Sequence, residues 1–290
     1  MTAFVQWLQR RRYALLILAI AVAPMVPMLA AALLTFETIR RGPYQGLVSA
    51  AIAATGVLVI GAAVGTNQLF NMVGVATMLS GAALGAIVTT TQSLALAFQA
   101  SLLFCIACVM IAVLIWPDAG ELIGPQLEAV LDVFRDNGAA PEQIEALSQL
   151  SEVFFGLSAA VVFAQLVVAL FLGYWWACLV SAPGKFGADF RALRLGRILG
   201  IPATLIMAVS LFLDLRLVQN LFPLVLFGFC FQGLAVTHAW AHAKRSNPAL
   251  LLVMYLLLVS PLTAVVILAL GSMGLTDNWI NLRSPLRAAT

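Results

Sequence analysis

Hydrophobic and polar positions along this chain form long alternating blocks rather than a fine pattern. Apolar runs are separated by short polar or charged connections. A run of roughly 20 apolar residues is long enough to cross a bilayer as an α-helix. The runs lie at about 13–36, 44–65, 69–89, 94–116, 153–180, 198–213, 217–241 and 249–270. They predict an all-α fold, a polytopic transmembrane helical bundle of about seven or eight hydrophobic segments.

The first run contains Pro24 and Pro27 and has arginines on both sides. Residues 10–12 are three arginines, and Arg40 and Arg41 follow the run. Because Lys and Arg are retained in the cytoplasm, both ends of the run should lie on that side. Proline removes a backbone donor and breaks a helix. We therefore expect a re-entrant hairpin that turns at Pro24–Pro27; a single crossing that departs from the charge rule is the alternative.

The last run and the residues after it also contain helix-breaking signals. Pro261 interrupts the run at 249–270, and residues 274–290 are rich in polar side chains. We expect a broken last span followed by a polar tail. Counting crossings forward from the acidic segment at 117–152, which we expect outside the cytoplasm, puts this tail outside the cytoplasm as well.

Residues 117–152 predict an acidic helical insertion outside the membrane. Eight of the 12 acidic residues lie there, with Arg135 as the only base. Apolar residues recur at helical spacing, Asn137-Gly138 is a typical helix end, and Pro141 suits a first helical position. We expect two amphipathic helices on the extracytoplasmic side of a single integral membrane domain, 1–290.

The connection at 181–197 is basic and amphipathic. Phe186, Phe190, Leu193 and Arg194 are spaced as on one side of a short helix lying in the membrane interface. The cytoplasmic side is expected for this connection.

The composition indicates that lipid surrounds most of the chain, and the motifs that the sequence lacks exclude several classes of function. Hydrophobic residues make up 63% of the chain and charged residues 9%, whereas soluble domains carry roughly a quarter charged residues. No basic stripe is interleaved with aromatics, so nucleic acid is not an expected partner. No phosphate-binding loop, zinc-protease motif or Ser-His-Asp arrangement is present. We expect no enzyme activity, no catalytic residue and no cofactor.

Polar side chains within spans are the main candidates for ligand contact, since each costs free energy to insert. Gln99, Gln165 and Gln232 are such residues; the alternative is that their amides join helices to one another. His238 and His242 are one helical turn apart, but no third metal ligand lies near, and we expect no metal site.

Two Gly-xxx-Gly pairs, Gly61/Gly65 and Gly81/Gly85, lie on adjacent predicted spans. Small residues let helix backbones approach closely in lipid. The pairs predict packing between neighbouring helices of one chain, with a homodimer interface as the alternative.

Three segments carry a resemblance to a known family. They are Ser-Ala-Pro-Gly-Lys-Phe-Gly-Ala-Asp-Phe-Arg-Ala-Leu-Arg-Leu-Gly-Arg at 181–197, Phe-Cys-Phe-Gln-Gly-Leu-Ala-Val-Thr-His at 229–238, and Gly-Leu-Thr-Asp-Asn-Trp-Ile-Asn-Leu-Arg at 274–283. In this order they resemble the YybS-like family of predicted bacterial inner-membrane proteins. Where the family usually has Asp-Phe, this chain has Asn281-Leu282.

The resemblance implies a multi-pass protein of the bacterial inner membrane. The family is distantly similar to substrate-binding subunits of energy-coupling-factor transporters, which bind vitamins or metals and pair with a partner complex. The matched positions imply ligand contact for Gln232, Gly233 and His238. They imply headgroup or partner contact for Phe190, Arg191, Arg194, Asp277, Trp279 and Arg283.

Together these observations predict a non-enzymatic small-molecule-binding or transport-related subunit. The alternative is a membrane scaffold or regulator that binds a cytoplasmic partner through its basic loops. The expected partners are the lipid bilayer and, depending on the hypothesis, a small-molecule ligand or a cytoplasmic protein.

Overall fold

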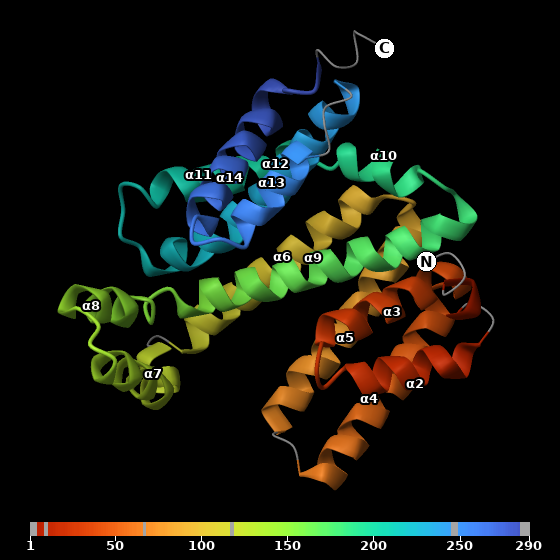
Figure 1. The fold of residues 1–290 in the computed structure, drawn as a ribbon, viewed down its shortest axis with the longest axis horizontal. Coiled ribbons are helices and arrows are strands. Elements are labelled where there is room, and N and C mark those ends of the chain that lie inside the picture. The colour runs from red at the N-terminus through yellow and green to blue at the C-terminus, as the bar shows by residue number, and fades with distance from the viewer. Residues whose placement is uncertain (1–4, 9–10, 66–67, 117–118, 245–248, 285–290) are drawn as a thin grey trace. The chain divides into compact units, whose positions relative to one another are not determined.

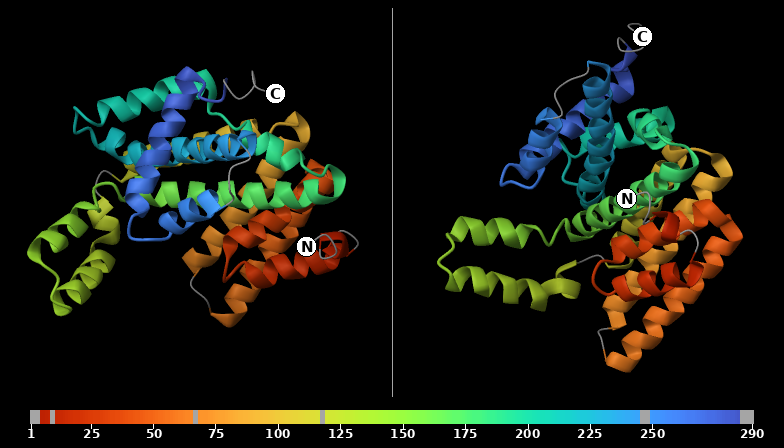
Figure 2. Two further views of the ribbon diagram at one scale, coloured as in Figure 1. Left: turned by 45° about the horizontal axis from the view of Figure 1, so that its top comes forward. Right: turned by 45° about the vertical axis from the view of Figure 1, so that its right-hand side comes forward.

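The computed structural model describes residues 5–8, 11–65, 68–116, 119–244 and 249–284, which form helices and connections without a strand (Figures 1 and 2). The helices are α2 (Arg12–Val22), α3 (Pro27–Arg41), α4 (Pro43–Val64), α5 (Gln68–Thr91), α6 (Leu94–Ile115), α7 (Ala119–Asp136), α8 (Pro141–Gln149), α9 (Phe154–Ser181), α10 (Lys185–Arg191), α11 (Gly196–Val209), α12 (Arg216–Ala243), α13 (Ala249–Leu258) and α14 (Thr263–Ile280).

Six helices among the described residues are long and apolar enough to cross a bilayer, namely α4, α5, α6, α9, α12 and α14. The number is seven if α10 and α11 form one broken span. The polytopic helical bundle is therefore confirmed. Prolines divide two of the predicted apolar runs, whose first parts form only short apolar helices, Tyr13–Val22 and Ala249–Leu258.

The chain separates into two compact units. Unit 1 consists of residues 1–101 and 162–194, and unit 2 of residues 102–161 and 195–290. Helices α6 and α9 contribute to both units.

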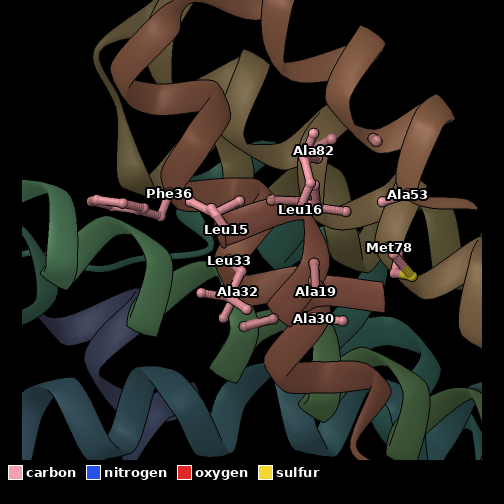
Figure 3. Packing of buried hydrophobic residues seen from close by; sticks show 14 of the residues in the cluster. Leu15, Leu16, Ala19, Ala30, Ala32, Leu33, Phe36, Ala53, Met78 and Ala82 are labelled. Carbon is pink, nitrogen blue, oxygen red and sulfur yellow. The ribbon is translucent and has the colours of Figure 1, made fainter. Parts of the chain in front are cut away.

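Unit 1 is built around the short helix α3. Every residue from Ala30 to Thr38 is buried, so no side of this stretch faces solvent or lipid. Figure 3 shows Ala32, Leu33 and Phe36 of α3 within the apolar core that α2, α4 and α5 complete. A helix enclosed in this way needs close neighbours with small side chains.

Glycines provide those close approaches. A Cβ atom on Gly81 would lie 2.7 Å from the carbonyl oxygen of Ala31, and one on Gly85 would lie 2.9 Å from that of Thr35. The Thr35 hydroxyl also lies 2.8 Å from the Gly81 carbonyl oxygen. Gly81 and Gly85 therefore pack within one chain, as predicted, but they pack against α3 and not against the neighbouring span α4. Gly65 instead ends α4 with a φ of 73°, a left-handed conformation that favours glycine.

The break predicted in the first apolar run is confirmed. Helix α2 ends at Val22, and Pro27 occupies the first turn of α3. A proline at that position loses no intrahelical hydrogen bond, whereas inside a helix it would remove one.

Unit 2 is organised around α12, which is the most enclosed candidate span. In the most apolar stretch of α12, 72% of the residues are buried, whereas the corresponding value for α6 is 28%. Helices α11, α13 and α14 pack against it. Gly233 and Gly274 lie at the crossing of α12 and α14, where a Cβ on Gly233 would collide with the Leu270 carbonyl oxygen.

The expectation of a polar tail starting at Gly274 is wrong. Helix α14 continues to Ile280, and Gly274 and Asp277 are buried. The polar side chains at this end have partners inside unit 2. Arg283 donates a hydrogen bond to the Asp277 carboxylate, and the indole N–H of Trp279 donates one to the Thr204 hydroxyl. Sequence polarity does not reveal such partners, of which Arg283 lies six residues from Asp277 and Thr204 lies 75 residues from Trp279.

The acidic segment forms the two predicted helices, α7 and α8, which pack against each other (Figures 1 and 2). Gly138, with a φ of 76°, follows α7, and Pro141 begins α8. Arg135 contacts Glu128 and Asp132 on its own helix at 2.7 and 2.6 Å. Both hydrogen bonds raise the pKa of the Arg135 guanidinium. Residues 117 and 118, where the predicted insertion begins, lie outside the described residues.

Candidate functional site

A pocket of about 240 Å³ lies at the C-terminal end of α3 and is lined by Phe36, Glu37, Arg40 and Arg41. Phe36 and Arg40, and likewise Glu37 and Arg41, are four residues apart, so each pair consists of neighbours on the helix surface. The helix ends here because Gly42, with a φ of 90°, and Pro43 follow it. The pocket combines two cations, one anion and an aromatic ring.

Glu37 is the buried charge of this pocket. The residue is 3% exposed, and its Oε1 atom lies 2.8 Å from Nε of Arg41. The orientation gives an ion pair rather than a hydrogen bond, since Oε1 accepts none from the described residues. A buried carboxylate is stable only when compensated, and Arg41 supplies the opposite charge.

Arg40 is the second cation of the pocket. Its guanidinium carbon lies 5.8 Å from the centroid of the Phe36 ring, within the range of a cation–π contact. Partial burial lowers the pKa of Arg40, repulsion by Arg41 lowers it further, and attraction by Glu37 opposes both. An anion in the pocket would relieve the repulsion between the two arginines.

Phe36 connects the pocket to the core of unit 1. Its ring makes an edge-to-face contact with Trp176 of α9, with centroids 6.4 Å apart. Both rings are largely buried. The apolar wall of the pocket is therefore held by a helix distant in sequence.

Two of the three glutamines predicted to lie within spans form hydrogen bonds with the backbone of another segment. The Gln99 amide donates a 3.0 Å hydrogen bond to the Arg194 carbonyl oxygen within unit 1. The Gln232 side chain is fully buried in unit 2 and accepts a 2.9 Å hydrogen bond from the backbone N–H of Leu195. Gln165 is half-buried on α9. The two bridging amides agree with the structural alternative to ligand contact.

Gln232, Asp277 and Arg283 form one buried polar network. The Gln232 amide donates to Oδ2 of Asp277 at 2.8 Å, and Nη2 of Arg283 donates to the same oxygen at 2.6 Å. Asp277 is fully buried, and Arg283 is 6% exposed. The sequence interpretation expected Asp277 and Arg283 to contact headgroups or a partner. The structure instead gives them interior positions.

The remaining ligand candidates of unit 2 also have local structural roles. Gly233 permits the close crossing of α12 and α14. The half-buried His238 has Nδ1 2.9 Å from the Leu234 carbonyl oxygen and Nε2 3.3 Å from the Tyr255 hydroxyl. The described residues contain no group of three or more His, Cys, Asp or Glu side chains arranged to hold a metal ion.

The basic connection forms the predicted short helix, α10, with an aromatic cluster at its side. The ring of Phe190 stacks on Phe186 and meets Phe171 of α9 edge-on at 5.3 Å. Nearby, Asp189 accepts hydrogen bonds from the Tyr174 hydroxyl at 2.5 Å and from the Lys185 ammonium at 2.6 Å. Headgroup or partner contact by Phe190, Arg191, Arg194 and Trp279 stays a prediction.

Sequence reasoning missed Glu37 and its pocket. Glu37 directly follows the first apolar run, and the sequence interpretation gave it no role. The available signal was the spacing of four residues between Glu37 and Arg41 at the C-terminal end of α3. Burial of α3 on all sides, which makes this pair notable, depends on packing that the sequence alone does not reveal.

Comparison with known proteins adds a family. No curated protein and no solved structure has significant similarity to this chain. The family described as predicted membrane protein (DUF2232) matches residues 13–275, a range that contains the α3 pocket and Gln232. Since the match covers most of the chain and agrees with its apolar helices, this protein belongs to the DUF2232 family of predicted membrane proteins.

Proposed function

We propose that this protein is a non-enzymatic, multi-pass membrane protein that binds a small molecule, as a binding or transport-related subunit. The observation that carries the proposal is the pocket at the end of α3, where Arg40, Arg41 and Glu37 surround about 240 Å³ of space. A buried carboxylate that makes an ion pair but accepts no hydrogen bond through Oε1 from the described residues is costly to maintain without a further role.

The size and chemistry of the pocket limit the ligand. Pockets for drug-sized ligands measure roughly 300–1,000 Å³, so this pocket suits a small molecule or one polar group of a larger one. Two arginines favour an anionic group, because guanidinium presents paired N–H donors to oxyanions. Phe36 provides an apolar wall for adjacent carbon atoms.

The resemblance to the YybS-like family supports this proposal. Through that resemblance the protein is similar to substrate-binding subunits of energy-coupling-factor transporters, and we propose the bacterial inner membrane as its location. This analogy concerns the fold and adds less weight than the pocket itself.

Native mass spectrometry of the protein extracted directly from membranes tests the proposal. We expect a specific small molecule on the wild-type protein and its loss from the Arg40→Gln variant. Arg135→Gln is the matched control, because Arg135 is an exposed arginine outside the pocket. Spectra without any bound molecule, or with equal occupancy in wild type and Arg40→Gln, would contradict the proposal.

A scaffold or regulator is the second candidate function. The observation that favours it is the basic residue Arg197, which is exposed directly after the connection between α10 and α11. This hypothesis expects a soluble protein to co-purify in mild detergent and to be lost from Arg197→Gln. Recovery of the protein alone under several gentle conditions would count against it.

A further inference from the structure

The charges of the α3 pocket have a definite balance. Arg40 and Arg41 contribute two positive charges and Glu37 one negative charge, so these lining residues carry a net charge of +1. The Glu37 side chain is 4% exposed and pairs with Arg41, whose side chain is 31% exposed. Arg41 is therefore largely neutralised within the pocket, and Arg40 contributes the charge that balances a ligand.

From this balance we infer that the pocket takes a singly charged phosphodiester group and that Glu37 determines this charge preference. The inference rests on the binding function proposed above. A phosphodiester carries one negative charge shared by two oxygens, which matches the net charge of the pocket. A phosphate monoester carries about −1.5 to −2 charges at neutral pH, and its additional charge would face the Glu37 carboxylate.

The geometry of the arginines agrees with this ligand class. A guanidinium group donates two parallel hydrogen bonds to an oxyanion, and Arg40 is fixed beside the Phe36 ring, 5.8 Å from its centroid. The ring offers apolar contact to the carbon substituents that a phosphodiester has and inorganic phosphate lacks. The volume of about 240 Å³ holds such a group with small substituents but not a nucleotide-sized molecule.

The phosphodiester can come from a lipid headgroup or from a soluble molecule. Three probes distinguish these sources: phosphatidylglycerol in nanodiscs, glycerophosphoglycerol, which is the same headgroup without acyl chains, and inorganic phosphate. Binding of each to the full-length protein is measured by native mass spectrometry titration. Preference for phosphatidylglycerol over glycerophosphoglycerol assigns the ligand to the membrane, and equal affinity assigns it to solution.

For the wild-type protein we expect the phosphodiester probes to bind at least about tenfold more tightly than inorganic phosphate, because the additional charge of inorganic phosphate faces the Glu37 carboxylate. Glu37→Gln removes the repelling charge and should tighten inorganic phosphate binding by about tenfold. The difference in affinity between the phosphodiester probes and inorganic phosphate should therefore become smaller. Arg40→Gln should weaken every probe by about tenfold. Arg135→Gln, at an exposed arginine of α7 outside the pocket, should change none of them.

The inference would be overturned if the wild type bound inorganic phosphate as tightly as the phosphodiester probes or more tightly. It would also be overturned if Glu37→Gln kept the wild-type preference for phosphodiesters over inorganic phosphate. In either case, binding that depends on Arg40 would still support the proposed function. Failure of all probes to bind in an Arg40-dependent manner would overturn the inference; absence of any co-purifying small molecule would also overturn the proposed function. If Arg40→Gln is not monodisperse, Arg40→Lys decides, because it keeps the charge and loses the paired donors.

Discussion

Gln232 and Asp277 are 45 residues apart in sequence, and the amide of the first donates a 2.8 Å hydrogen bond to the carboxylate of the second. Neither residue is exposed. Gln232 also accepts a hydrogen bond from the Leu195 backbone, and Arg283 donates to the same carboxylate. The three segments that carry the family resemblance therefore meet within one buried network in unit 2.

The first prediction concerns the amide at the centre of this network. Gln232→Leu leaves the Leu195 N–H and one lone pair of Asp277 without their partner, and should destabilise the protein by about 2–3 kcal/mol. Unfolding by SDS titration from mixed micelles measures the change. Gln165→Leu, at a half-buried amide on α9, is the control and should change stability by about 1 kcal/mol or less. Equal effects of the two substitutions would contradict the assigned role.

The ion pair of the network gives a second prediction. Arg283→Leu leaves the buried carboxylate of Asp277 without its cation and should cost about 3–5 kcal/mol. The double variant Asp277→Asn with Arg283→Leu removes the unpaired charge and should recover part of this loss. The same SDS titrations measure the double variant and both single variants, Arg283→Leu and Asp277→Asn. A double variant that is as unstable as the sum of the two single variants would show that the pair is not coupled.

The close crossing of α12 and α14 gives a third prediction. In Gly233→Ala the new methyl group collides with the Leu270 carbonyl oxygen, so the helices must separate, at a cost of about 1–3 kcal/mol. Gly74→Ala within α5 is the matched control, since a Cβ there comes no closer than 3.9 Å to the nearest atom, the carbonyl oxygen of Ala23. Alanine should stabilise that helix by up to about 1 kcal/mol. Thermal unfolding in detergent should therefore move in opposite directions for the two variants.

Much of the helical organisation was predictable from the sequence because apolar runs and breakers act locally. The predicted spans at 44–65, 94–116 and 153–180 agree with α4, α6 and α9 within one or two residues. Prolines and glycines fixed the ends of α3, α7 and α8 through their own backbone preferences. These signals need no knowledge of tertiary contacts.

The misjudged positions depend on contacts between distant segments. Asp277 appeared to belong to an exposed tail because its partners, Gln232 and Arg283, are not adjacent to it in sequence. Glu37 received no role in the sequence interpretation because the burial of α3 depends on glycines from other helices. In lipid, a polar residue is tolerated wherever a partner exists, and sequence polarity alone does not identify that partner.

The fourth prediction concerns the topology of α2 and α3. If they form a re-entrant hairpin, cysteines introduced as Arg11→Cys and Arg41→Cys should react with an impermeant maleimide only from the cytoplasmic side. Asp136→Cys, in the acidic segment, should react only from the opposite side. Labelling of positions 11 and 41 from opposite sides would instead indicate that the first apolar run crosses the membrane once.

The central claim is that a small molecule binds at the C-terminal end of α3, and a cryo-electron microscopy map of the protein in native nanodiscs tests it most directly. We predict density beyond the protein within hydrogen-bonding distance of the Arg40 guanidinium, beside Phe36, and its absence from a map of the Arg40→Gln variant. Ligand density beside Gln232 or Gln99, with the α3 pocket empty in both maps, would contradict the account.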